Sequence, residues 1–440
     1  MTGMAAVAEE GLPNHPNAKW MGLIAGLSHN MIVGCLMGSF SVMLASVESR
    51  MGVTRAESSS VGALVLFGSA LMGAAVGPIM GRYSLRPLMF FGAALMVTGF
   101  LTLAFTTSYP LYIAVYLLLF GPSMAIAGSV GPATLVTRWF SQNRGLALGL
   151  VHLSLVVAVM PLLATWILAH YGAQATYLTM GVLVAVILFP ATLMIRDYPP
   201  SMVPGIGGPN NSDRGIAMPA SEAIEDFIPG EDPQVEAEKN TAANAASLTV
   251  PQILSNPAFW AIATVAGLII TQIMMLTFNM IQIAASHGIT GYDAALLQAI
   301  MSFSGMAGSI LFGWVADRIG GGRGMALIAL DCAILLMLLQ LDLPYPARAV
   351  VTGLLGLHGA GMIPNVSRAL AHSFGPGSFS RAFGMQSALS VPFTAIGLVA
   401  MGISFDKTQS YDTALTGIAI MMVIGIPLAL YAARKPLIRA

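Results

Sequence analysis

The chain has 440 residues, of which 56% are hydrophobic and only 9% are charged, and its mean hydropathy is +0.78. A soluble domain carries roughly 25% charged residues, so this composition argues against a soluble enzyme. The formal net charge of zero leaves no basic surface for nucleic acid. We therefore expect an all-α membrane protein that crosses the lipid bilayer many times.

Twelve stretches of the chain are long and apolar enough to cross a bilayer, which takes about 20 residues each. They fall into two sets of six, separated by a polar and acidic stretch over residues 197–250. The spans are expected at approximately 20–46, 59–80, 87–107, 111–136, 145–170, 173–195, 257–285, 292–315, 324–342, 348–371, 382–404 and 412–433.

This division predicts five parts of the chain. Residues 20–196 and 251–434 are expected to form two pseudo-symmetric six-helix bundles, as in transporters that are built from repeats. Residues 197–250 form a polar cytoplasmic linker, and residues 1–19 and 435–440 are the ends. The N-terminal residues lack the basic start of a cleaved signal peptide, so we expect them to be retained.

Basic residues are distributed unevenly over the predicted connections. If the N-terminus lies inside and the spans alternate, fifteen of the 19 Lys and Arg residues fall inside. Only Arg50, Arg55, Arg348 and Lys407 fall outside. Cytoplasmic loops carry an excess of Lys and Arg, so the distribution favours twelve spans with both termini in the cytoplasm. We expect a multi-pass protein of the inner (plasma) membrane.

The connection between the eighth and ninth spans carries the pattern Gly313-x-x-x-Asp317-Arg318-x-Gly-x-x-Arg323. It resembles the loop motif of the major facilitator superfamily in its second-half copy. The resemblance implies that Asp317, Arg318 and Arg323 act as a cytoplasmic latch between helices and do not bind substrate. In the first half, Arg82 belongs to the corresponding latch, but the residue before it is a glycine where the family has an acid.

Two local patterns resemble the monocarboxylate transporter and oxalate–formate antiporter group of that superfamily. One begins at Arg138-Trp-Phe and continues to Gly149, and the other runs from Pro251 to Trp260. Antiporters of this kind hold a dicarboxylate with basic residues in the eighth and eleventh spans. Here those positions fall at or near Ser309 and Ser390, neither of them basic, so a weakly charged monoanion or a substrate bound by His and amide groups fits better than a dicarboxylate.

Ionisable side chains in the bilayer core cost at least ~2.5 kcal/mol, so each requires an explanation. Asp331 lies well inside the ninth span, as either a protonation site or a structural hydrogen-bonding group. Arg368 lies near the inner end of the tenth span, as either an anion partner or a residue that reaches the lipid headgroups. For Arg138, its counterpart in the first half, we favour the interfacial interpretation.

Three histidines, His29, His152 and His358, lie inside the first, fifth and tenth spans. Imidazole titrates near neutral pH, so each could couple a proton to transport. In this superfamily the first, fourth, seventh and tenth spans line the cavity. We therefore expect His29 and His358 to face a midplane site from opposite halves. Interhelical hydrogen bonds, worth about 0.6 kcal/mol on average in membranes, are the alternative.

Amide and hydroxyl groups complete the predicted substrate site. Asn279 and Gln282 are three residues apart and share a helix face. The sequence contains no cluster with metal-ligand spacing and no Walker loop, so neither a metal nor another cofactor is expected. The substrate-binding candidates are His29, Asn30, Asn279, Gln282, His358, Asn365, Gln386 and Ser390. The candidates for proton coupling or anion pairing are His29, His152, His358, Arg368 and Asp331.

These features predict a secondary active transporter rather than an enzyme. It is expected to act as a monomer and to take up a small organic monocarboxylate with protons by alternating access. Two alternatives stay open. The first is a proton-driven exporter of amphipathic or aromatic compounds, which the direction of flux would distinguish. The second is a non-transporting sensor that uses the linker to bind a partner.

Overall fold

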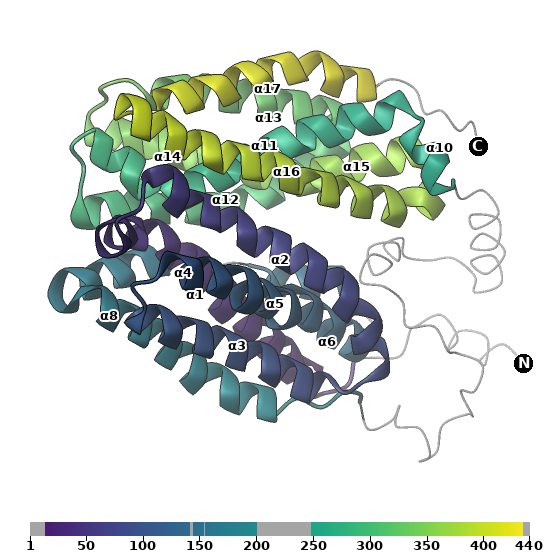
Figure 1. Cartoon of the computed structure of the whole chain (residues 1–440). Coiled ribbons are helices and arrows are strands. Elements are labelled where there is room, and N and C mark those ends of the chain that lie inside the picture. The colour runs from purple at the N-terminus through teal and green to yellow at the C-terminus, as the bar shows by residue number, and fades with distance from the viewer. Residues whose placement is uncertain (1–13, 141–143, 154, 200–247, 434–440) are drawn as a thin grey trace, which may run out of the picture.

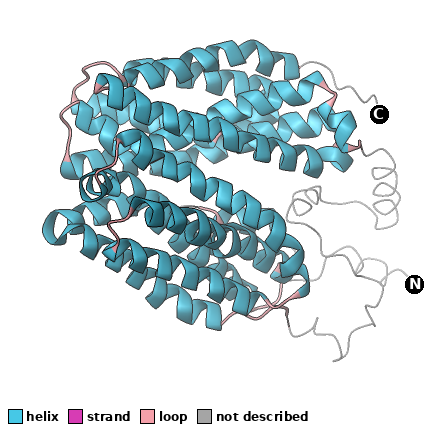
Figure 2. Ribbon diagram, viewed as in Figure 1, coloured by secondary structure: helices cyan, strands magenta, loops and turns pink. Residues whose placement is uncertain are grey.

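The computed structural model describes residues 14–140, 144–153, 155–199 and 248–433. Every regular element in these ranges is a helix (Figure 2), which confirms the predicted all-α class. Residues 1–13, 200–247 and 434–440 lie outside the described residues. The predicted roles of the two ends and of most of the linker therefore stay predictions.

The first three spans are single helices: α1 (Ala18–Met51), α2 (Arg55–Arg82) and α3 (Leu85–Phe105). The fourth span is irregular, because two π-helical stretches, labelled η, interrupt it. It consists of α4 (Tyr109–Val115), η1 (Tyr116–Phe120), α5 (Gly121–Ser123), η2 (Met124–Val130) and α6 (Gly131–Trp139). After it come α7 (Arg144–Val151) and α8 (Leu155–Leu193).

Helix α8 contains a chain reversal at Gly172, where φ is 80° and ψ is 178°. Glycine adopts this conformation readily, whereas a side chain would strain it. Of the described residues, eleven helical stretches are long and apolar enough to cross a membrane, and the one over Ala147–Leu193 divides at this glycine. Its two parts are the fifth and sixth spans, so the predicted number of twelve is reached.

The second half repeats the plan of the first. After the short α10 (Val250–Leu254), its six spans are α11 (Pro257–Ser286), α12 (Gly291–Ile319), α13 (Gly321–Leu339), α14 with α15 (Tyr345–Ala360 and Met362–Phe374), α16 (Pro376–Thr408) and α17 (Asp412–Ala432). The two six-helix bundles lie one above the other in Figure 1. This arrangement confirms the predicted fold.

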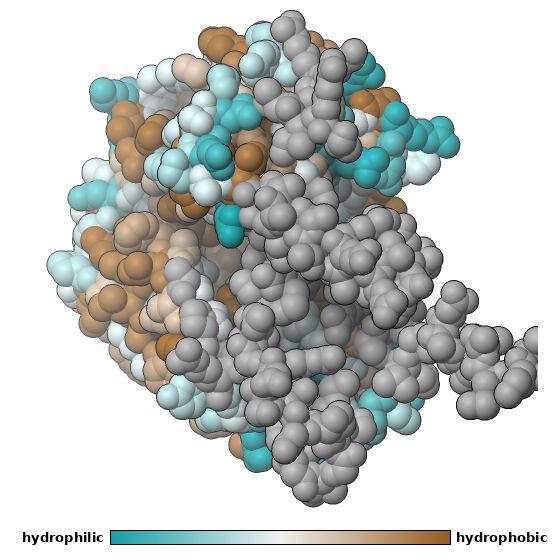
Figure 3. Space-filling view, turned by 90° about the vertical axis from the view of Figure 1, so that its right-hand side faces the viewer, coloured by the Kyte–Doolittle hydropathy of each residue, from teal (hydrophilic) through white to brown (hydrophobic). Residues whose placement is uncertain are grey.

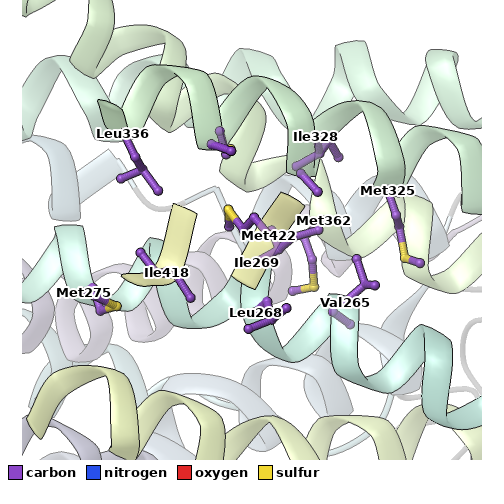
Figure 4. Packing of buried hydrophobic residues seen from close by; sticks show 14 of the residues in the cluster. Val265, Leu268, Ile269, Met275, Met325, Ile328, Leu336, Met362, Ile418 and Met422 are labelled. Carbon is purple, nitrogen blue, oxygen red and sulfur yellow. The ribbon is translucent and has the colours of Figure 1, made fainter. Parts of the chain in front are cut away.

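Each bundle has its own buried apolar core. In the second half, methionine and branched aliphatic side chains of α11, α13, α15 and α17 interdigitate (Figure 4). Lipid tails are as apolar as these side chains, so close packing rather than transfer from water holds the helices together. Phe278 and Leu398 of the second half belong to the core of the first half, which joins the bundles.

We call the side on which α1 begins and α17 ends the terminal face; it lies at the right of Figure 1. Figure 3 looks onto this face, where hydrophilic side chains gather at the top and right and hydrophobic side chains dominate the flank at the left. The other side is the opposite face. In this frame the tip of α1 at Met51 and the start of α2 lie at the opposite face.

The two bundles meet at the opposite face in what we call the closing contact, formed by Arg55, Ala56 and Ser59 of α2 with Leu398, Gly402 and Asp406 of α16. The carboxylate of Asp406 accepts hydrogen bonds from the backbone N–H groups of Arg55 (3.0 Å) and Ala56 (2.9 Å). It thereby caps α2 from the other bundle. A Cβ atom on Gly402 would lie 2.1 Å from the Cα of Ala56, so only glycine allows this approach.

Arg55 also ties the closing contact to its surroundings. Its guanidinium donates hydrogen bonds to Glu48 of α1 (2.7 Å) and to the phenol of Tyr411 (2.7 Å). Burial raises the pKa of Tyr411, so the phenol stays neutral and accepts this bond. Nearby, the Ser41 hydroxyl donates to Gln282 Oε1 at 2.9 Å. The described hydrogen bonds between the bundles are thus concentrated at the opposite face.

Candidate functional site

His29 and His152 lie side by side where the first, fourth and fifth spans meet. Their ring centroids are 4.6 Å apart and the ring planes are inclined by 56°. His29 is 7% exposed, and its Nδ1 lies 2.6 Å from the carbonyl oxygen of Gly128. Nδ1 of His152 lies 2.9 Å from the carbonyl oxygen of Leu148. A carbonyl only accepts hydrogen bonds, so both Nδ1 atoms carry hydrogen.

The irregular fourth span positions His29. A π-helical turn displaces carbonyls from the regular helical ladder and is frequent at functional sites. In η2 two consecutive carbonyls turn to α1: that of Ala127 accepts from Ser28 at 2.6 Å, and that of Gly128 contacts His29. A Cβ atom on Gly128 would come within 2.9 Å of Ile32, so the glycine allows the two spans to approach.

A break in the fifth span positions His152. Helix α7 ends at Val151 and α8 begins at Leu155, and the side chain of Asn30 on α1 bonds to the first turn of α8. Its Oδ1 accepts from the backbone N–H of Val156 at 3.2 Å, an orphan donor in the first turn of α8. Asn30 therefore positions the fifth span, and its predicted contact with substrate stays a prediction.

His358, which was expected to face the midplane site from the second half, lies beside Asp331. Its Nε2 is 3.2 Å from Oδ2 of Asp331, and its Nδ1 is 2.6 Å from the carbonyl oxygen of Leu354. The ring also packs on Phe312 at 5.1 Å. The pair joins α14 to α13 just before the tenth span is interrupted at Gly361, whose N–H bonds to the carbonyl oxygen of His358.

The predicted amides have separate hydrogen-bond partners. Gln282 belongs to the contact with Ser41. Asn279 donates to the carbonyl of Met275, one turn earlier in its own helix. Gln386 and Ser390 bond to each other along α16 at 2.8 Å. Among the described contacts, these residues act within helices or between bundles, and their role in binding substrate stays a prediction.

The side chain of Asn365 is buried in a contact between helices. Its Nδ2 donates to the carbonyls of Phe312 and Gly361, which ties α15 to α12. A Cβ atom on Gly324 would collide with its Oδ1 at 1.7 Å, so α13 approaches it closely as well. A bound substrate would have to displace this packing.

Gln272 of α11 and Gln298 of α12 were missed in the sequence, although both are amides inside a span. Gln272 is 1% exposed, and both polar atoms of its side chain lack a hydrogen-bond partner within the described part of the chain. Oε1 of Gln298 also lacks one there, while its Nε2 donates to the carbonyl of Thr277. Unpaired buried amides are costly, and they mark positions where a substrate group or a water would bind.

At the terminal face the acid of the second-half motif pairs with a residue of the tenth span, while the latch role of the motif residues stays a prediction. Asp317 lies 3.7 Å from Arg368, and both side chains are more than half exposed. Arg318 stacks on Trp314, with 3.9 Å between the guanidinium and the ring centroid. Arg368 therefore lies at the surface beside the latch acid. Arg323 has no ion pair among the described contacts, and the side chain of Arg82 lies outside the described residues.

In the first half, Asp197 at the end of the sixth span supplies an acid at the terminal face. It lies 3.4 Å from Arg138 Nη1 and accepts hydrogen bonds from the Ser84 hydroxyl and the Leu85 N–H, both at 2.6 Å. Arg138 also bonds to the carbonyl of Met80 at the end of α2. Four spans are joined in this way, although Gly81 replaces the motif acid.

We expect Asp197→Ala to destabilise the fold by about 1–2 kcal/mol, because the start of α3 loses its cap and Arg138 loses its anion. Thermal unfolding of the purified protein should show a melting temperature several degrees lower, and Asp197→Asn should lie between. Asp342→Ala is the control, because it removes a fully exposed carboxylate whose contact with His287 at 3.6 Å is a surface pair of small energetic effect. An unchanged melting temperature for Asp197→Ala would show that this carboxylate does not stabilise the fold.

The chain is similar to known membrane transporters along most of its length. A sequence profile described as Major Facilitator Superfamily matches residues 27–344. YcxA, an uncharacterised MFS-type transporter of Bacillus subtilis (strain 168), is 22% identical over 421 residues, which cover 90% of each chain. An uncharacterised MFS-type transporter of Mycobacterium tuberculosis is 23% identical over 421 residues, covering 94% of this chain and 86% of the relative.

A fungal relative and a solved structure agree with these matches. The MFS-type transporter pynF of Aspergillus niger is 22% identical over 314 residues, covering 71% of this chain and 63% of its own. The crystal structure of a bacterial homologue of the human lysosomal transporter Spinster, inward-facing and unoccupied, matches with a TM-score of 0.64. It covers 95% of this chain and 96% of its own at 13% identity, so the likeness concerns the fold.

Proposed function

The chain belongs to the major facilitator superfamily, which makes it a multi-pass membrane transporter, and on this premise we propose that it carries a small organic monocarboxylate inward together with protons. The superfamily supports the role of a secondary transporter. The substrate class, the direction and the coupling ion are the proposal, and the histidine pair in the first half carries it.

A membrane-embedded carboxylate needs a positive partner, because a dehydrated anion is costly to move through a low-dielectric medium. The pair of His29 and His152 can supply one. The rings are 4.6 Å apart, so one added proton gives a single positive charge, and a second would set two like charges against each other. This capacity of one charge matches a monocarboxylate and not a dicarboxylate.

Gln272 is suited to support the pair from the second half. The first and seventh spans both run from the terminal face to the contact between Ser41 and Gln282. His29 precedes Ser41 by twelve residues, or about 18 Å along the helix, and Gln272 precedes Gln282 by ten, or about 15 Å. The two side chains therefore lie at a similar depth. An unpaired amide N–H at that depth could donate to an anionic oxygen.

The orientation follows from the basic residues. The sequence assigns fifteen of 19 Lys and Arg residues to the connections on the side of the termini, which favours a cytoplasmic terminal face. The closing contact at the opposite face then shuts the site from the exterior. On this assignment the conformation with the closing contact formed is one that releases substrate into the cytoplasm, and opening of that contact admits the next substrate.

We assign proton coupling to His358 and Asp331. The imidazole and the carboxylate are 3.2 Å apart. The pair has no net charge when it holds one proton more than a neutral imidazole and an ionised carboxylate. Its net charge changes when a proton leaves or arrives. The pair sits where α14 gives way to α15, so its charge acts on the interruption in the tenth span. Asp331 is one-third exposed in a span, where a lone carboxylate would be unfavourable.

Asp331→Asn should separate coupling from binding, because an amide resembles the protonated acid permanently. We expect counterflow at equal pH to stay within about threefold of the wild type, since it needs only the loaded carrier to reorient. Uphill accumulation driven by a pH gradient should fall at least about tenfold. Asp342→Asn, at an exposed site, is the control. Equal losses in both assays would remove the pair from a coupling role.

The proposal as a whole is tested with purified protein in liposomes. Counterflow of radiolabelled monocarboxylates, from lactate to aromatic acids, is measured at neutral and mildly acidic pH. We expect uptake of one acid that its unlabelled form competes away and that is faster at acidic pH. If an outward-directed flux of amphipathic compounds follows the proton gradient and no acid is exchanged, the exporter is the correct function and the monocarboxylate proposal fails.

A further inference from the structure

A cavity of about 670 Å³ lies in the second half, and neither the His29–His152 pair nor the His358–Asp331 pair lines it. Residues of α11, α16 and α17 line it. Helices α16 and α17 each pack along α11 but diverge from one another, which leaves a groove between them. Ile396 and Met421 in its wall are 70% and 52% exposed although they belong to membrane spans, so the groove opens toward the bilayer.

The lining of this cavity changes from apolar to polar along its length. Leu268, Phe393 and Ile396 form the deep end, and Lys407, Thr408 and Thr413 form the rim at the opposite face. Phe393 and Lys407 are fourteen residues apart on α16, which corresponds to about 21 Å. One leaflet of the hydrocarbon core is about 15 Å thick. The groove therefore runs the full depth of a leaflet, with its polar end at the headgroups.

Lys407 is available for an external anion. Of the four basic residues expected at the opposite face, Arg50 bonds to the carbonyl of Thr106, Arg55 to Glu48 and Tyr411, and Arg348 to the carbonyls of Leu339 and Leu341. Lys407 alone forms no hydrogen bond or ion pair with the described part of the chain. The neighbouring carboxylate of Asp406 is engaged by the amides of α2.

We propose that this cavity binds an anionic phospholipid of the opposite-face leaflet, with one acyl chain in the groove and the phosphate at Lys407. A groove that opens at the depth of the hydrocarbon core is in contact with lipid and excluded from water. Acyl chains have no preference for the groove on hydrophobicity alone, because the surrounding tails are equally apolar. Selectivity therefore comes from the fit of the chain and from the ammonium group.

Native mass spectrometry of the full-length protein tests the proposal, with dioleoylphosphatidylglycerol and dioleoylphosphatidylcholine as probes. We expect one tightly retained phosphatidylglycerol per chain and weaker retention of phosphatidylcholine. Lys407→Gln should weaken phosphatidylglycerol binding about fivefold, the effect of one basic residue at a membrane surface, and leave phosphatidylcholine unchanged. Lys19→Gln, at the terminal face, is the matched charge control.

Gly417→Leu tests the groove itself, because a Cβ atom on this lining glycine meets no atom within 4 Å. The added side chain enters the cavity without a clash, so the protein should stay folded. Binding of both lipids should weaken at least about tenfold. Gly384→Leu, at another open glycine, is the control. Equal retention of phosphatidylglycerol by Gly417→Leu and wild type, or equal affinity of the wild type for both lipids, would overturn the proposal.

Discussion

Replacement of His29 by glutamine is expected to reduce counterflow of the monocarboxylate substrate at least about tenfold and to remove its dependence on pH. Glutamine can still donate to the carbonyl of Gly128, so the packing of α1 on η2 is retained. Glutamine cannot take up a proton, so the imidazole of His152 is the only ring of the pair left to carry a positive charge. A hydrogen bond to a charged group contributes about 1.5–3 kcal/mol, which corresponds to a loss of about tenfold or more.

The companion variants define what the result means. His152→Gln should show the same loss, and the double variant should be little worse than either single one, because the two rings act as one unit. His170→Gln is the matched control and should transport normally, because His170 is exposed and its described bond is to the carbonyl of Trp166 within α8. If His29→Gln and His152→Gln both retain transport with its pH dependence, the pair does not bind the anion. The structural role of His29 would then be the correct one.

The architecture was predictable because its signals are local and strong. Each span is a long apolar run, and the reversal at Gly172 falls between the fifth and sixth runs that hydropathy separates. The alternation of basic loops fixes the even number of crossings. The acidic stretch between the halves marks the division into two bundles. These features depend on composition over 20 residues and do not require knowledge of which helices touch.

The partners of the polar residues were not predictable in the same way. His29 and His152 were both identified, but their pairing depends on the π-helical stretch in the fourth span and the break in the fifth. A π-turn adds one residue and rotates the rest of the helix about its axis, and a uniformly apolar span carries no pattern that reveals it. His358 was expected to face the midplane site from the second half, and the structure places it beside Asp331.

The two latches show the same limit. The sequence indicates that Gly81 replaces the acid of the first-half motif, but the acid found at that end of the bundle is Asp197, more than a hundred residues later. Arg368 could be assigned to the cavity or to the interface from its position in the span. Its side chain is 56% exposed and lies 3.7 Å from Asp317, a partner on α12 that the position of Arg368 in its span does not reveal.

Replacement of Gly402 by valine is expected to abolish most transport by preventing the closing contact. A Cβ atom there would lie 2.1 Å from the Cα and 2.6 Å from the backbone nitrogen of Ala56. Backbone atoms cannot rotate away, so α2 and α16 must separate, and the bonds of Asp406 to the start of α2 lengthen. Overpacking costs about 1–3 kcal/mol, and this cost falls only on the conformation that contains the contact. We expect transport to fall at least about tenfold.

Gly402→Val should lower the fraction of molecules in which the closing contact is formed, without unfolding the protein. The two effects can be distinguished. Ser59 is buried at the closing contact, so a cysteine placed there should react slowly with a membrane-impermeant maleimide added at the opposite face. Combined with Gly402→Val it should react much faster, while the native Cys35 and Cys332 stay buried. Gly384→Val, at an open position of the same helix, should change neither labelling nor transport.

Slow labelling with low transport would mean that the bundles still close and that the loss arises elsewhere. Fast labelling with normal transport would show that closure at this point is not required for the cycle, which contradicts alternating access through the closing contact.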